Sequence, residues 1–185
     1  MDSMVPTATR DDAMSDAAAP STSSLVSTRW VAGLGLVVSL LLAFSAATIG
    51  GLATAQGVSE WYPTLTKPSW TPPSWVFGPV WTTLYTLMGI SSWLIWMRRG
   101  VAPGVPVALG VYGIHLVVNA LWSVSFFALR DPGLALLNIL ALDGLVIATI
   151  VLFARIRPLA AGLLVPYLLW ALFATGLNLT IWRLN

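Results

Sequence analysis

The sequence predicts an all-α integral membrane protein, folded as a bundle of five transmembrane helices. Hydrophobic residues make up 57% of the 185 residues and charged residues only 9%, whereas soluble domains carry about 25% charged residues. Five apolar stretches are each close to the roughly 20 residues that cross about 30 Å of hydrocarbon as a helix. Segments of alternating polarity, which a membrane barrel would need, are missing from the sequence. The predicted helices cover about 30–55, 79–97, 106–129, 133–153 and 159–182.

The remaining segments predict a tail and a lid. Residues 1–28 are rich in Ser, Thr, Ala, Pro and Asp, and we expect a disordered N-terminal tail before a membrane domain at 29–185. The one long connection, 56–78, contains four prolines that prevent a continuous helix. It is rich in tryptophan and tyrosine, and we expect it to fold over the helix ends as a lid.

Basic residues at the helix ends predict the orientation. Arg29, Arg98, Arg99, Arg155 and Arg157 fall on the side of the N-terminal tail, and Lys67, Arg130 and Arg183 fall on the side of the long loop. Cytoplasmic loops carry the excess of lysine and arginine. The N-terminus is therefore expected in the cytoplasm and the lid loop on the opposite side.

Composition excludes several kinds of chemistry. The chain has no cysteine and one histidine, His115, which excludes disulfides, thiolate sites and multi-histidine metal ligation by this chain alone. We expect no metal and no resident cofactor. The net charge of +2 gives no argument for a nucleic-acid partner.

Aromatic and amide side chains gather in the half of the bundle beneath the long loop. Trp81 and Tyr85 are spaced i, i+4, and Trp170, Ala174 and Asn178 are spaced i, i+4, i+8, so each set lies on one face of its helix. This pattern predicts an aromatic-walled pocket that opens toward the loop. Trp170 lies too deep for an interfacial belt residue, and core packing is as good an interpretation for it as pocket wall. Trp122 and Asn138 are expected within about two turns of the loop side, and Asn119 deeper, at the level of Asp143. For the two asparagines, interhelical hydrogen bonding is favoured over ligand contact.

Asp143 lies near the middle of the fourth predicted helix, where an acid costs about 2.5–3.5 kcal/mol on insertion scales. It must face the interior, be protonated or have a partner. Asn119 is the candidate partner, and His115 lies one turn from it. Structural pairing is favoured over a proton relay.

Small residues recur at every fourth position of the first predicted helix and allow another helix to approach closely. Packing within the bundle and a dimer seam are equally good interpretations of this ladder. Its members are Gly35, Ser39, Ala43, Ala47 and Gly51.

Several of these segments together resemble the tryptophan-rich sensory protein family, also called the translocator protein or peripheral-type benzodiazepine receptor family. The segments are Lys67-Pro-Ser-Trp70-Thr-Pro72-Pro73, Phe77-Gly-Pro79-Val-Trp81 with Tyr85, Asn119-Ala-Leu-Trp122 with Phe126-Phe127, Asp143, and Pro166 to Asn178. The resemblance is to bacterial-type members.

The resemblance implies a five-helix bundle, often dimeric, that binds tetrapyrroles such as protoporphyrin IX beneath the first loop. It also implies Ala174 and Leu177 as ligand-wall residues, and Trp81 and Trp170 as the two tryptophans associated with light-dependent porphyrin breakdown. The sequence differs from the family at the proposed cholesterol motif: Trp182 precedes Arg183, where that motif requires a tyrosine. Sterol binding is therefore not predicted.

The predicted function is binding of tetrapyrroles and other lipophilic ligands, with a sensory or regulatory role. A light-dependent porphyrin-degrading enzyme and a porphyrin or lipophile transporter are the alternatives. The expected partners are the bilayer, the tetrapyrrole and a second copy of the chain, with Lys67 as a counter-charge for the porphyrin propionates. The candidate catalytic residues are Trp81 and Trp170, and the candidate ligand-binding residues are Trp61, Trp70, Trp81, Tyr85, Asn119, Trp122, Asn138, Asp143, Trp170, Ala174, Leu177 and Asn178.

Overall fold

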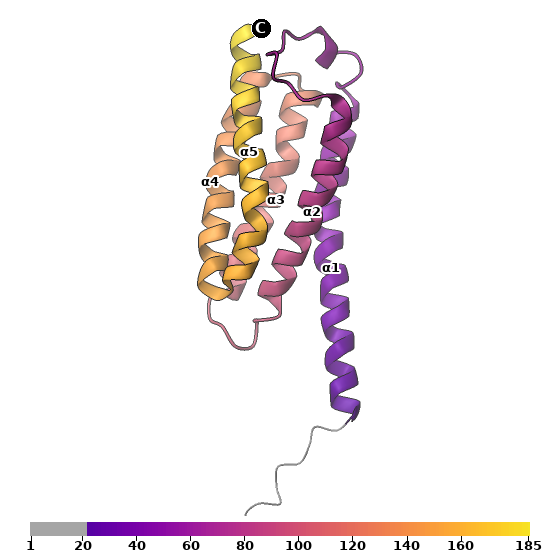
Figure 1. Ribbon diagram of the computed structural model, residues 1–185, viewed down its shortest axis with the longest axis vertical. Coiled ribbons are helices and arrows are strands. Elements are labelled where there is room, and N and C mark those ends of the chain that lie inside the picture. Colours follow the sequence, from indigo (N-terminus) through magenta and orange to yellow (C-terminus); the bar gives the residue numbers. More distant parts are fainter. Residues whose placement is uncertain (1–21) are drawn as a thin grey trace, which may run out of the picture. The chain divides into compact units, whose positions relative to one another are not determined.

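The computed structural model describes residues 22–185, with side chains from residue 29 onward. Within these residues the secondary structure is entirely helical, as predicted. Most of the expected disordered tail, residues 1–21, lies outside the described part of the chain. The helices are α1 (Thr22–Ala55), η1 (Tyr62–Thr64), α2 (Ser74–Trp96), α3 (Val105–Ser123), η2 (Val124–Ala128), α4 (Pro132–Ile156) and α5 (Pro158–Leu184) (Figure 1).

Four of the five long helices are long and apolar enough to cross a membrane. They provide the spans Arg29–Ala55, Val105–Ala128, Pro132–Ile156 and Pro158–Leu184. The second helix, α2, is not among them; its sequence contains tryptophan, tyrosine, proline, serine and threonine residues, all of which lower its mean hydropathy.

Two helices begin several residues earlier than the sequence predicted, and the other three long helices begin one residue earlier. The N-terminus of α1 is Thr22, inside the stretch expected to be tail, and α2 begins at Ser74 rather than at 79. Pro79 lies within α2, where a proline near the N-terminus of a helix removes a single backbone hydrogen bond. The prolines before Ser74, and not Pro79, therefore set the start of this helix.

The turn between α3 and α4 has a clear physical basis. The chain continues from α3 through one π-helical turn, η2, and Arg130 then adopts a positive φ of 56°. The carboxylate of Asp131 accepts hydrogen bonds from the backbone N–H groups of Gly133 and Leu134 at 3.0 and 2.9 Å. This N-cap satisfies donors that the first turn of α4 would otherwise leave unpaired.

Residues 34–185 form one compact body, in which α5 packs between α2 and α4 and α3 packs on α4 (Figure 1). The small-residue ladder of α1 is used within this body. Gly35 lies against the ring of Trp96, and Ser39 and Ala43 are buried. Packing within the bundle is thus the interpretation of the ladder that the structure supports over this stretch.

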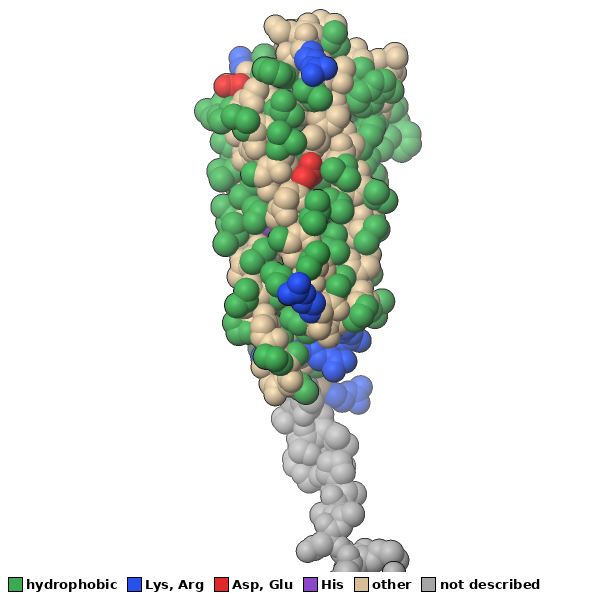
Figure 2. All heavy atoms as spheres, turned by 90° about the vertical axis from the view of Figure 1, so that its left-hand side faces the viewer, with side chains coloured by type: hydrophobic (Ala, Val, Ile, Leu, Met, Phe, Trp, Pro, Cys, Tyr) green, Lys and Arg blue, Asp and Glu red, His purple; other side chains and the backbone are tan. Residues whose placement is uncertain are grey.

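The outer surface of this body suits a lipid environment. Figure 2 shows hydrophobic side chains spread over much of the face on the α4 side, with an acidic side chain near its middle and lysine and arginine side chains toward its two ends. Large apolar side chains such as Leu137 of α4 and Leu169 of α5 are more than half exposed. Soluble monomers rarely expose large contiguous apolar patches.

Candidate functional site

A cavity of about 470 Å³ lies between α1, α2, α3, η2, α5 and the loop 56–73. This volume falls within the range of roughly 300–1,000 Å³ that is usual for small-molecule sites. None of the residues that line the cavity is charged. Its aromatic lining comprises Phe44, Tyr62, Phe77, Trp81, Tyr85, Trp122, Phe126, Phe127, Trp170 and Phe173.

Two tryptophans, one on α2 and one on α5, belong to this wall. Trp81 stacks on Tyr85 one turn along α2, with 5.4 Å between ring centroids. Trp170 stacks on Phe173 of α5 at 5.3 Å and meets Phe77 edge-on at 5.8 Å. The helical spacing seen in the sequence places each stacked pair on one face of its helix. The wall therefore presents aromatic rings held by other aromatic rings.

Two asparagines fix the inner wall. Asn119 of α3 accepts a hydrogen bond from the hydroxyl of Tyr85 and donates to the hydroxyl of Tyr167 at 2.9 Å, which ties α3 to α2 and α5. Asn178 of α5 accepts from the indole N–H of Trp122 at 3.0 Å and donates to the carbonyl of Pro132 at 2.7 Å. Both amides use their hydrogen bonds within the protein and orient aromatic side chains toward the cavity.

Aromatic side chains of the long loop lie against the helix ends. Trp61 and Tyr62 pack against Phe126 at ring-centroid distances of 5.4 and 6.2 Å. Trp70 meets Phe173 edge-on at 5.6 Å. Burial raises the pKa of Tyr62 above its ordinary value, because the phenolate form would lose solvation. These contacts make the loop a cover over one end of the cavity.

Polar contacts hold the same loop, some within the loop itself and some between the loop and the C-terminal residue. The ammonium group of Lys67 donates to the carbonyls of Tyr62 and Leu65 at 2.8 and 2.9 Å. Lys67 is not part of the cavity wall, and its ammonium group is engaged within the loop; its role as a counter-charge for propionates at the cavity mouth stays a prediction. The side-chain oxygen of Asn185 accepts from the N–H of Thr66 at 2.9 Å, and its amide donates to the Thr66 carbonyl at 3.1 Å.

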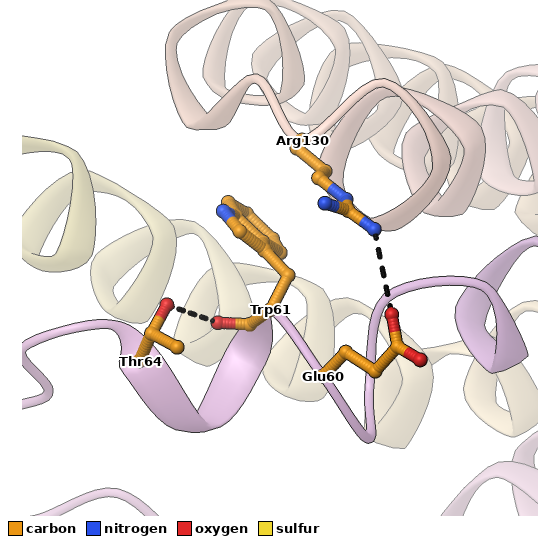
Figure 3. Close-up of polar contacts among 4 residues, drawn as sticks. All are labelled: Glu60, Trp61, Thr64 and Arg130. Carbon is orange, nitrogen blue, oxygen red and sulfur yellow. Dashed lines mark hydrogen bonds and ion pairs between the residues drawn. The ribbon is translucent and has the colours of Figure 1, made fainter.

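An ion pair links the start of the loop to the turn between α3 and α4 (Figure 3). Arg130 lies 4.0 Å from the carboxylate of Glu60. In the same view the hydroxyl of Thr64 donates to the carbonyl of Trp61 at 2.7 Å and closes the short helix η1. Both charged side chains are largely exposed, and exposed pairs of this kind contribute at most about 1 kcal/mol.

The structure brings eight of the twelve predicted ligand-binding residues to the cavity wall. They are Trp81, Tyr85, Asn119, Trp122, Trp170, Ala174, Leu177 and Asn178. The other four, Trp61, Trp70, Asn138 and Asp143, are not in the wall. Trp61 and Trp70 pack on the outer side of wall residues and support the cover.

The expected pair of Asp143 and Asn119 is not formed. Asp143 instead accepts a hydrogen bond from the hydroxyl of Thr175 on α5 at 2.8 Å. Asn119 is already engaged by two tyrosines, and His115 lies buried between the rings of Tyr112 and Tyr167. Among the described residues no group of three His, Cys, Asp or Glu side chains could hold a metal ion.

The sequence reasoning missed the wall that α1 contributes. Phe44, Ala47, Thr48 and Gly51 line the cavity, and their spacing follows one face of that helix. The small-residue ladder was the available signal, because Ala47 and Gly51 belong to it. The ladder predicted that another helix approaches α1 closely. At Ala47 and Gly51 the small side chains instead leave space for the cavity.

Comparison with known proteins gives a consistent picture. Residues 37–183 match the family model described as the TspO/MBR family. The human translocator protein is 46% identical over 127 residues, which cover 68% of this chain and 75% of that protein. The tryptophan-rich protein TspO of Archaeoglobus fulgidus is 43% identical over 82% of this chain and 97% of its own length. The tryptophan-rich sensory protein of Cereibacter sphaeroides is 40% identical over 80% and 92%, respectively.

Proposed function

Because the chain belongs to the TspO/MBR family of membrane proteins, we propose that it binds a tetrapyrrole in the aromatic cavity and serves a sensory or regulatory role. Other flat, lipophilic molecules of similar size are ligands of the same site. No resident cofactor is required, because the porphyrin is itself the ligand. Nucleic acid is not a partner.

The observation that carries this proposal is the uncharged aromatic wall. A flat macrocycle gains about 0.5–1.5 kcal/mol for each favourable ring pair beyond the burial of apolar area. The rings of Trp81 and Trp170 line the cavity, where such a ligand would contact them. A carboxylate moved into an apolar site without a partner is strongly disfavoured. The propionates of a porphyrin therefore remain outside the cavity while the ring is inside.

The proposal includes the arrangement in the membrane. We propose that α2 spans the bilayer as a fifth helix, because its 23 residues extend about 35 Å at 1.5 Å per residue, enough for the hydrocarbon core. Ser91 and Ser92 are buried and bond to backbone carbonyls, and the exposed hydroxyls of Thr82 and Thr83 each donate to the carbonyl four residues earlier at 2.9 Å, so these groups keep hydrogen-bond partners in lipid. The N-terminus is placed in the cytoplasm, and the functional unit is a homodimer.

A titration of the purified protein in detergent with protoporphyrin IX tests the proposal. Binding should quench tryptophan fluorescence with a saturating, single-site curve. Ala47→Phe, which fills the cavity from α1, should weaken binding, and Ala141→Phe on the exposed face of α4 is the matched control. A linear, unsaturated quench, or the same affinity in both variants, would show that the cavity does not hold porphyrin.

Light-dependent porphyrin degradation is the second candidate, favoured by the presence of Trp81 and Trp170 among the three indoles of the wall. An electron-rich indole in contact with the ring can give one electron to the photoexcited porphyrin and become a radical cation, and the reduced porphyrin then passes the electron to dioxygen, the terminal oxidant. Trp81→Phe and Trp170→Phe should then lower the photodegradation rate per bound porphyrin much more than the affinity, and Trp93→Phe is the control. The enzyme hypothesis fails if all three variants keep the original ratio of degradation rate to bound fraction.

A further inference from the structure

We infer that flat lipophilic ligands enter this cavity sideways from the lipid, through a slit between the C-terminal half of α1 and the N-terminal half of α2. This inference rests on the proposed function, since it concerns how that same cavity is loaded. The ligand class that follows is one that dissolves in the bilayer and is thin enough to pass edge-on between two helices. The loop over the cavity end is then a cover and not the entrance.

The exposure of the wall residues locates the slit. Every wall residue from α3, η2 and α5 is buried or half-buried. The exposed wall residues all come from α1, the turn that follows it, and α2. Two of them on α2, Gly78 and Thr82, continue a stripe that starts at Ser74 with a spacing of four residues. The complete exposed set is Thr48, Gly51, Val58, Ser74, Gly78 and Thr82.

Glycine contacts show why α1 and α2 separate here. A Cβ atom on Gly89 of α2 would lie 3.1 Å from the Cα atom of Leu40, so the two backbones touch at that level. Nearer the loop, α1 approaches α3 instead, because a Cβ on Gly50 would lie 3.1 Å from the hydroxyl of Ser123. The helix thus leans on α2 at one level and on α3 at the next. The gap left beside α2 is the slit.

The rim of the slit has open space at two glycines and the chemistry that a lipid-facing entrance requires. No atom lies within 4 Å of the position that a Cβ would take on Gly51 or on Gly78. The hydroxyls of Thr48 and Thr82 each donate to the carbonyl four residues earlier at 2.9 Å, so their donors are satisfied within the helix. Polar groups that face hydrocarbon need such internal partners. None of the rim residues is charged.

The loop end, by contrast, is held shut. A ligand that entered there would have to break the two hydrogen bonds between Asn185 and the backbone of Thr66. It would also have to separate Trp70 from Phe173 and Tyr62 from Phe126. Sideways entry leaves all of these contacts intact.

The test compares loading rates of protoporphyrin IX into the full-length protein in phosphatidylcholine vesicles, followed by stopped-flow tryptophan quenching. Gly78→Phe and Gly51→Phe narrow the slit. Gly162→Phe is the control, because Gly162 is also an exposed helical glycine with open space around it. Asn185→Ala removes the hydrogen bonds that hold the loop. The slit variants should slow association and dissociation together by about tenfold, equivalent to about 1.4 kcal/mol of added barrier. The Gly162 and Asn185 variants should keep the original rates. Faster loading in Asn185→Ala with unchanged rates in the slit variants would overturn the inference.

A second measurement does not depend on porphyrin binding. Because the chain has no cysteine, Ala174→Cys places a single thiol in the cavity wall. A bilayer-soluble N-pyrenylmaleimide should label it faster than a sulfonated, water-soluble maleimide, and adding Gly78→Phe should slow only the first reagent. Faster labelling by the sulfonated reagent would refute sideways entry. Absence of porphyrin binding with this labelling pattern intact would refute the proposed ligand alone.

Discussion

Replacement of Asn119 by leucine isolates the polar contact that ties three helices together at the inner wall of the cavity. The side chain is buried, and it bonds the hydroxyl of Tyr85 on α2 and that of Tyr167 on α5. Leucine has the same number of side-chain heavy atoms and the same branching, with somewhat greater volume, so Asn119→Leu removes both hydrogen bonds without opening a cavity. Both tyrosine hydroxyls then lose their partner inside the bundle.

The expected loss of stability follows from the number of bonds removed. Interhelical hydrogen bonds in membranes average about 0.6 kcal/mol and reach about 1.7 kcal/mol, so two bonds are worth about 1–3 kcal/mol. In soluble cores a buried polar group without a hydrogen-bond partner costs more free energy. That larger cost does not apply in full here, because these hydroxyls also find hydrogen-bond partners when the chain is unfolded in detergent. Tyr167→Phe removes only one of the two bonds and should cost about half as much. The double variant should therefore be less destabilised than the sum of the two single variants.

Unfolding by dodecyl sulfate titrated into mild detergent micelles, followed by circular dichroism, measures these differences. Asn138→Leu is the matched control: this second asparagine lies on α4, and its side-chain oxygen is buried without a hydrogen-bond partner. It should lose less than about 0.5 kcal/mol or gain stability, since an unpaired amide is replaced by an apolar group. Equal losses at the two asparagines, or no loss at Asn119, would refute the claim that this contact joins the helices.

Three further results are expected. Ala174→Thr adds a methyl and a hydroxyl to the cavity wall and should weaken binding of bulky ligands by about 1–3 kcal/mol, measured by titration; unchanged affinity would place Ala174 outside the ligand contact. Lys67→Met removes the donors to the carbonyls of Tyr62 and Leu65 and should speed chymotryptic cleavage of the loop, whereas equal cleavage would show that Lys67 does not order it. Burial raises the pKa of Tyr62 above its ordinary 10.0, so its contribution to stability is complete below pH 10 and is lost as the pH rises further; Tyr62→Phe should remove this part of the alkaline loss in unfolding experiments.

The sequence was sufficient for the helical architecture because the lipid leaves few alternatives. Long apolar stretches between polar connections can only be helices in a bilayer, and four of them are confirmed as span-length apolar helices. The start of α2 was misplaced because Pro79 was taken as the first helical residue. The structure shows instead that a proline is accommodated one turn inside this helix.

The parts of the site that depend on the spacing of residues within one helix were predictable. The contacts that depend on how two helices are placed relative to each other were not. The spacing of Trp81 and Tyr85 on α2, and of Trp170 and Ala174 on α5, put each set in the wall. The partner of Asp143 depends on the rotation of α5 against α4, which brings Thr175 to it. Periodicity within a single helix carries no information about that rotation, so the choice of Asn119 was wrong for a physical reason.

The way the polar groups of the cavity are used limits how it can select a ligand. The amides of Asn119 and Asn178 hold aromatic side chains in place, and the hydroxyls of Thr48 and Thr82 bond to their own helices. What the wall offers to a ligand is therefore ring faces and little directed hydrogen bonding. We therefore expect the cavity to discriminate between ligands by size and flatness. A bulky molecule fits poorly and loses binding free energy, whereas a ligand that lacks one polar substituent leaves no protein group without a hydrogen-bond partner. A series of porphyrins that differ only in peripheral polar groups should consequently bind with affinities within about tenfold of each other, a spread of about 1.4 kcal/mol, whereas a puckered ring of equal mass should bind much more weakly. Strong dependence on a single polar substituent would mean that a side chain now engaged within the protein turns toward the ligand instead.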